Sequence, residues 1–246
     1  MNATDDHSLT ITLRIPGAWS DPGELLQRLP AGFHMTPETL SLPDGTQIEF
    51  FPMPADDQFV QIFQSSCRHT PTSEERALIS RYTVNIGLSG PGGSLEAAQV
   101  MMQAAAAIVQ AGGAGVFVDN SALAHGGKDW IKMTEDGSGD AMSFAFVSIV
   151  RGPGTTYTLG MQTMGFADLL MNAADIDEQG DTIIEIMRYI CDEIKPVEVG
   201  HLFADEQGPR FQVVAKTSDD FDAQSPMHNP HGRLKIVSVK DLADSN

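Results

Sequence analysis

A glycine-rich segment contains the first residues whose types and spacing could do chemistry. It reads Ser89-Gly90-Pro91-Gly92-Gly93-Ser94 and lies between an apolar stretch, 82–88, and an Ala-rich stretch, 95–110. A strand followed by glycines and a helix N-terminus can bind phosphate, because unpaired backbone N–H groups point outward there. The segment lacks the G-x-G-x-x-G spacing of dinucleotide sites and the Gly-Lys-Ser/Thr of P-loops. A tight turn into a buried helix is therefore the favoured interpretation, and an anion or nucleotide site is the alternative.

A second polar group follows the next apolar stretch, 115–119. Asp119 ends that stretch, and His125, Lys128 and Asp129 come within the next ten residues. Ligands of open parallel sheets bind at the ends of strands, so these side chains could act together with the glycine-rich segment. Ordinary capping beside an exposed loop is the simpler interpretation. The candidate ligand-binding residues are Ser89, Gly90, Gly92, Gly93, Ser94, Asp119, His125, Lys128 and Asp129.

Patterns for a nucleophile are incomplete. Residues 87–91 read Gly-Leu-Ser-Gly-Pro, in which Pro91 stands where a nucleophile elbow needs a small residue. Neither Cys67, which Arg68 follows, nor Cys191 belongs to a recognised pattern for a reactive thiol. No catalytic residue is therefore assigned.

Metal-binding patterns are incomplete as well. Residues 175–180 imitate the start of a calcium loop, but the twelfth place holds Ile186 instead of glutamate. His228 and His231 form H-x-x-H without the further ligands that zinc needs. We therefore expect no metal and no cofactor.

The first third of the chain predicts short elements. Alternating apolar residues predict a strand at 8–15, and Ser20-Asp21-Pro22 predicts the start of a helix that Pro30 ends. Pro43-Asp44-Gly45-Thr46 is a turn tetrapeptide, which predicts a hairpin between 39–42 and 47–51. A further strand is expected at 59–63, and Thr72 with Glu75 fits a helix capping box.

The remaining two thirds predict two strand–helix–strand units. The first comprises a strand at 82–88, a helix at 95–110 and a strand at 115–119, and the second spans 166–203 with a helix at 181–194. Between them, 141–150 and 155–160 flank a Gly-Pro-Gly turn and predict a hairpin. Further strands are expected at 211–215 and 234–239, with an acidic loop at 216–231. This pattern favours an α+β fold, a mixed sheet covered by helices, of which a ferredoxin-like split arrangement is one version.

Two blocks resemble a bacterial family, the domain of unknown function numbered four-two-six-one. They are Gly112-Gly113-Ala114-Gly115-Val116-Phe117-Val118, after the Ala-rich helix, and residues 158–169, Thr-Leu-Gly-Met-Gln-Thr-Met-Gly-Phe-Ala-Asp-Leu. The resemblance covers about residues 82–194, and Met164 and Ala167 depart from it where the family often has Phe and Pro. It implies a bacterial α+β domain and carries over no catalytic residue.

Composition narrows the function. The chain has 246 residues with 15 Lys and Arg and 33 Asp and Glu, and 15 − 33 gives a net charge of −18. That balance argues against nucleic acid and an anionic membrane surface, and the two cysteines and polar N-terminus favour a cytoplasmic protein. Residues 1–70 are expected to pack on a core domain at 71–246. We expect a non-catalytic binding or interaction domain with a protein partner or self-association, and the alternative is a small-molecule enzyme built on the 89–94 and 119–129 segments.

Overall fold

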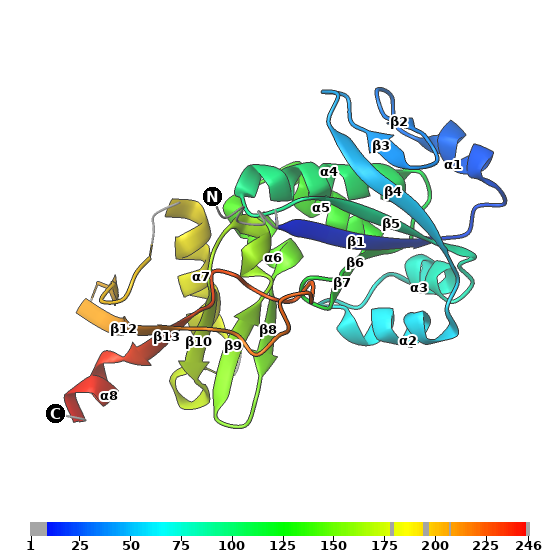
Figure 1. The fold of residues 1–246 in the computed structure, drawn as a ribbon. Coiled ribbons are helices and arrows are strands. Elements are labelled where there is room, and N and C mark those ends of the chain that lie inside the picture. The colour runs from blue at the N-terminus through cyan, green and yellow to red at the C-terminus, as the bar shows by residue number, and fades with distance from the viewer. Residues whose placement is uncertain (1–8, 178–179, 194–196, 207, 245–246) are drawn as a thin grey trace.

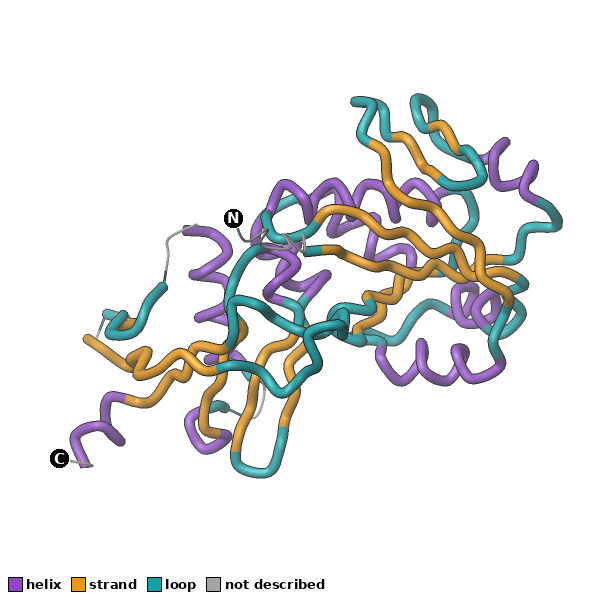
Figure 2. Tube along the Cα trace, viewed as in Figure 1, coloured by secondary structure: helices purple, strands orange, loops and turns teal. Residues whose placement is uncertain are grey.

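Two β-sheets with helices packed on them make up the protein, as Figures 1 and 2 show. The computed structural model describes residues 9–177, 180–193, 197–206 and 208–244. The predicted α+β fold is confirmed, whereas a ferredoxin-like arrangement is not confirmed. Expectations for residues 1–8, including Ser8 of the predicted strand, and for residues 178–179, 194 and 207 lie outside the described residues.

The larger sheet, sheet A, has the strand order β2-β3-β4-β5-β1-β6-β7, with every neighbouring pair antiparallel. The predicted hairpin at 39–51 is confirmed: β3 pairs with β4, and the turn between them places Gly45 at φ +89°. Strands of the first 70 residues thus pair directly with strands that follow them. The bounds are β1 (Thr10–Gly17), β2 (His34–Met35), β3 (Thr39–Ser41), β4 (Gln47–Pro54), β5 (Val84–Pro91), β6 (Gly115–Val118) and β7 (Leu123–Gly126).

The first strand–helix–strand unit is split by β1. Helix α4 (Leu95–Gln110) connects β5 to β6, and its bounds are those that the sequence predicts. Strands β5 and β6 are parallel to each other, but β1 lies between them and is antiparallel to both. The sequence predicts a unit of three consecutive elements, but its two strands are joined in the sheet by β1, which comes from the N-terminal part of the chain.

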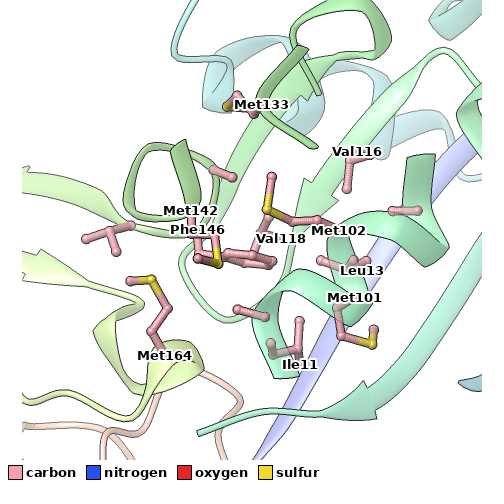
Figure 3. Packing of buried hydrophobic residues seen from close by; sticks show 14 of the residues in the cluster. Ile11, Leu13, Met101, Met102, Val116, Val118, Met133, Met142, Phe146 and Met164 are labelled. Atoms are coloured by element: carbon pink, nitrogen blue, oxygen red, sulfur yellow. The ribbon is translucent and has the colours of Figure 1, made fainter. Parts of the chain in front are cut away.

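Helix α4 packs on the apolar face of sheet A. Ile11, Leu13 and Ile15 of β1 alternate toward it and are fully buried, because successive side chains of a strand point to opposite faces. Figure 3 shows Met101 of α4 beside Ile11 and Leu13, and Met102 on the side of Val118 and Phe146. The methionines fill the irregular space between the sheet and the helices, as flexible thioether side chains do well.

Residues 59–63 are helical, which makes the predicted strand wrong. They belong to α2 (Asp57–Ser66), which Asp56 caps by accepting a hydrogen bond from the Gln58 amide. Phe59 and Phe63 are four apart and lie on one helix face, where they pack with Tyr82 and Phe117 on the second face of sheet A. The apolar spacing has a period near four, and reading it as a period of two caused the error.

Helix α3 confirms the predicted capping box. It comprises Ser73–Ile79; the Thr72 hydroxyl accepts a hydrogen bond from the Glu75 amide, and the Glu75 carboxylate accepts one from the Thr72 amide. Helix α1 (Pro22–Arg28) begins after Asp21 and also follows its prediction. These local signals succeed because capping depends on residues only a few positions apart.

The segments at 119–129 and 141–150 differ from their predictions. Residues 119–122 form a turn, and His125 then lies in β7, paired with β6. Helix α5 (Gly127–Asp136) follows at once, so the expected 119–129 loop is mostly regular structure. Residues 141–146 belong to helix α6 (Gly139–Phe146) and not to a strand. Only the strands that follow, β8 and β9, form the predicted hairpin.

The smaller sheet, sheet B, has the order β11-β12-β13-β10-β9-β8, in which only β10 and β13 pair in parallel. In the second predicted unit, β11 lies at the sheet edge, separated from β10 by β12 and β13. Residues 197–201 lie outside β11, and the helix α8 was not predicted. The bounds are β8 (Ser148–Arg151), β9 (Thr155–Leu159), β10 (Asp168–Asn172), α7 (Asp181–Glu193), β11 (Leu202–Asp205), β12 (Gly208–Thr217), β13 (Arg233–Ser238) and α8 (Val239–Asp244).

A connecting loop, residues 218–232, ties the two sheets together through buried polar groups. Asn229 donates from Nδ2 to Asp168 Oδ2 at 2.8 Å, and the Pro226 carbonyl accepts from Asn120 Nδ2 at 3.0 Å and from Gln162 Nε2 at 3.3 Å. Burial raises the pKa of Asp168 to about 6, against the hydrogen bonds from Asn229, Met161 and Thr158 that favour its charged form. The acidic loop is thus a structural connection as well as a solvated surface.

Among the described residues, none of the helices combines the length and the apolar character needed to span a bilayer.

Helix α2 provides a test of the corrected assignment. Phe63→Ala is expected to lower the free energy of unfolding by about 3–5 kcal/mol, because it empties a fully buried site beneath the sheet. Ile62→Ala in the same helix, where the side chain is 43% exposed, is the matched control and should change it by less than about 0.5 kcal/mol. Urea unfolding followed by circular dichroism measures both. Equal losses for the two variants would contradict this packing of α2.

Candidate functional site

An apolar groove of about 510 Å³ lies on sheet A beside α1. Ten of its thirteen lining residues are apolar, and the polar ones are Asp21, Thr36 and Thr83. Ligand pockets typically have volumes of about 300–1,000 Å³ and a mostly apolar lining with few polar groups. The volume of this groove lies within that range and its lining is mostly apolar, which makes it a candidate binding site.

The floor of the groove is the same sheet face that α4 covers further along. Phe50 and Pro52 of β4 and Val84 and Ile86 of β5 form it, with Pro52 opposite Ile86. Two residues further along each strand, on the same face, Phe50 lies opposite Leu88, which is fully buried in the main core. The groove is therefore a part of the core face that no helix covers completely.

One wall is the segment that leads into α1. The Asp21 carboxylate caps the helix by accepting from the Gly23 amide at 2.8 Å and the Glu24 amide at 3.1 Å, and Pro22 occupies the first turn. Leu25 is buried at 3% exposure, while its neighbour Leu26 remains 46% exposed on the groove. Trp19 anchors the wall, since its indole N–H donates to the Ala111 carbonyl at 2.8 Å.

The opposite wall is the β2–β3 hairpin, which contributes Met35, Thr36 and Pro37. Strand β2 pairs with β3 through Met35 and Leu40, and Leu40 is fully buried. The two walls come from residues 19–26 and 35–37, while the floor comes from two other strands. The groove thus exists only when the four segments are assembled.

Electrostatically the groove offers little for acid–base chemistry. Asp21 is its only titratable lining residue, and two backbone amides already occupy that carboxylate. A proton transfer needs a titratable group free to face the substrate. The groove can bind an apolar group by burying it. Its lining residues provide no group for a chemical step.

The glycine-rich segment presents few free backbone donors. Ser89, Gly90 and Pro91 belong to β5 and pair with β1, so this part is a strand and not the predicted loop. The Gly92 amide donates to Leu9 O at 2.8 Å, and the Gly93 amide donates to Thr163 O at 2.9 Å. Ser94 caps α4 through the Ala97 amide. A phosphate would have to displace these bonds, which makes the segment a turn into the helix.

Asp119 lies next to Ser89 across β1, so the structure brings these two candidate residues to the same end of the sheet. The Asp119 amide donates to Thr12 O, and Thr12 is the partner of Ser89. The Asp119 carboxylate is 2.9 Å from Nε of Arg14, an ion pair on the second face of sheet A. Burial raises the pKa of Asp119, while Arg14 opposes that shift. The charges of Asp119 and Arg14 therefore compensate each other.

His125 is a core residue. It is 1% exposed, Nε2 donates to the Ala145 carbonyl at 3.0 Å, and the ring packs against Trp130 and Phe144. Burial, followed by the nearby Arg68 charge, lowers the pKa of His125 to about 3. The imidazole is neutral at physiological pH and does not contact solvent.

Lys128 and Asp129 lie in the first turn of α5, near residues of the α2–α3 connection. The Lys128 amide donates to Glu75 Oε1 at 2.8 Å, and Asp129 lies 3.5 Å from His69 Nδ1. Burial, with the charges of Glu75 and Asp129, raises the pKa of Cys67 to about 11, so that thiol is not activated. None of the nine candidate residues lines the groove.

Among the described residues, no group of three or more His, Cys, Asp or Glu side chains is arranged to hold a metal ion. Asp177 caps α7 by accepting from the amides of Gly180, Asp181 and Thr182, and Ile186 is buried. His228 contacts Asp219 at 3.1 Å in the connecting loop. The calcium-like and H-x-x-H patterns therefore have structural roles in this part of the chain.

Sequence reasoning missed the groove. The one signal it offers is the pair Leu25-Leu26, because a seven-residue helix over a sheet needs only one of two adjacent leucines for its buried side. The floor and the hairpin wall come from residues far apart in sequence, which periodicity cannot bring together.

Comparisons of the chain with protein-family models, with curated proteins and with solved structures find no match. The resemblance to the domain-of-unknown-function family therefore stays a prediction, and the groove must be interpreted from its own geometry.

The buried histidine predicts a pH dependence. A His whose pKa is lower in the folded state adds stability above its unfolded pKa of about 6.5, and this is lost as pH falls toward 3. Relative to His125→Gln, wild type should lose up to about 1.4 kcal/mol of unfolding free energy per pH unit below 6.5. Urea unfolding of both proteins between about pH 7 and pH 4 measures this difference.

The comparison with the variant removes groups common to both proteins, including Asp168, whose raised pKa works in the opposite direction. A difference between wild type and His125→Gln that stays constant over this range would contradict a neutral, buried His125.

Proposed function

We propose that this protein is a non-catalytic binding domain and that the groove between α1 and the β2–β3 hairpin is its binding site. The carrying observation is the composition of the groove: ten apolar lining residues and a single carboxylate that is used as a helix cap. Transfer of apolar surface from water supplies roughly 25 cal/mol per Å² buried, which is the main source of affinity for such a site.

Leu26 supports the proposal. Of the described residues, only Leu26, Ile62, Val199 and Leu202 are large hydrophobic side chains with substantial exposure. Leu26 is the one that faces the groove, next to the buried Leu25. A contiguous apolar surface bordered by polar residues is typical of an interaction site.

The small-molecule enzyme built on 89–94 and 119–129 receives no comparable support. The Gly92 and Gly93 amides are engaged, and His125 is buried and neutral. Catalysis at that place would need these groups to be free, so we keep the binding domain as the single proposal.

Nile red, a neutral apolar dye, tests the proposed site. We expect saturable binding with a blue-shifted emission in wild type, weakened roughly tenfold by Leu26→Gln and by Met35→Gln on the opposite wall. Ile62→Gln, an equally exposed aliphatic residue on α2, is the matched control and should bind as wild type does. Binding that is insensitive to both wall variants would place the dye elsewhere and contradict the proposal.

A further inference from the structure

We infer that the occupant of the groove is a cationic amphipathic helix of a protein partner, an inference that rests on the proposed function. It follows from the distribution of charge around the groove, from the strand edges that border it and from the depth of its aromatic residues.

The walls of the groove are acidic. Residues 18–46 supply both walls, and they contain four Asp and Glu but only one basic residue of the Lys/Arg type, so 1 − 4 gives −3. That residue, Arg28, is already paired with Glu24. Asp21 lines the groove, and Glu38 follows Pro37 on the hairpin wall. Such a field attracts cations and repels anions.

The same field decides between two kinds of protein partner. A second copy of this chain would bring its own net charge of −18 and its own acidic groove, and like charges facing each other are unfavourable. Self-association through the groove is therefore opposed, whereas a partner with Lys or Arg beside its apolar residues is favoured. A ligand with a carboxylate or phosphate head group is disfavoured for the same reason.

Strand addition at this edge is blocked. Beyond its pairing with β3, the outer edge of β4 contains Pro52 and Pro54, which have no N–H to donate. Edge strand β2 has only two residues, and Pro37 follows it closely. A partner cannot extend the sheet here, so it must insert side chains into the groove.

The aromatic residues disfavour a polyproline segment. Such peptides dock on exposed aromatic surfaces, but Trp19 in the wall and Phe50 in the floor of the groove are only 7% and 6% exposed. The Trp19 N–H is also occupied by Ala111. A deep apolar floor between two walls fits the other common mode, in which a helix inserts anchors at i, i+3, i+4 and i+7.

Model peptides test this with the full chain and isothermal titration calorimetry. The probe is a helical Leu/Lys peptide of about 18 residues with leucines on one face. The first comparison peptide has Glu in place of each Lys, and the second has the Leu/Lys composition without helical periodicity. We expect the amphipathic Leu/Lys peptide to bind at least roughly tenfold more tightly than either comparison peptide.

Variants localise the binding. Leu26→Gln should weaken the Leu/Lys peptide roughly tenfold, while Ile62→Gln should not. Asp21→Asn removes a charge but keeps a good cap, and it should weaken binding more than Asp56→Asn, the same change at the cap of α2. Raising the salt concentration should also weaken binding, since screening shortens the reach of exposed charges.

The outcomes separate the two proposals. If the Leu/Glu peptide binds as tightly as the Leu/Lys peptide, or if Leu26→Gln has no effect on the Leu/Lys peptide, the helix inference is overturned. If Nile red binds the groove but no Leu/Lys peptide does, the inference fails and the proposed binding function stands. If neither probe responds to the wall variants, both fail.

Discussion

The position of β1 between β5 and β6, inside sheet A, is the constraint on which the rest of the structure depends. Both strands of the β5–α4–β6 unit form their hydrogen bonds to β1 and not to each other. Its alternation gives the sheet two different faces: Ile11, Leu13 and Ile15 lie beneath α4, while Arg14 faces the other side with Asp119. A one-residue slip of β1 would exchange the two faces, so the eight-residue pairing with β5 sets the orientation of every strand around it.

The groove follows from how far the covering helices reach. Seven strands spaced about 4.8 Å apart make a sheet about 29 Å wide, whereas one helix covers about 10 Å. Helices α4 and α5 cover the strands on the β1 side, and beyond β5 the same apolar face continues as Phe50, Pro52 and Ile86. The short α1 and the β2–β3 hairpin border this region and line the groove as its two walls; Figure 1 shows α1 beside this hairpin. The exposed apolar surface is therefore a consequence of a wide sheet with few helices.

The sequence predicts local structure well and assembly poorly. Helix α4, the capping box of α3 and the 43–46 turn depend on neighbouring residues, and all three are confirmed. The 59–63 strand failed because a short apolar run fits two periods, and the contacts of Phe63 decide between them. The role of His125 depends on Ala145 and Trp130, which no spacing rule connects to it. The groove is formed by four separate segments, so the one indication of it in the sequence is Leu26, a second leucine beside the one that α1 buries.

Charge and apolarity have complementary roles in this arrangement. Part of the −18 charge that argues against nucleic acid and anionic surfaces lies on the walls of the groove, since residues 18–46 carry a net charge of −3. Repulsion between like-charged copies opposes self-association through an exposed apolar groove. In the proposed complex the same charges would act on specificity and association rate, while buried apolar anchors would supply affinity. An apolar groove in an acidic setting can thus remain open to a cationic partner and closed to a second copy of itself.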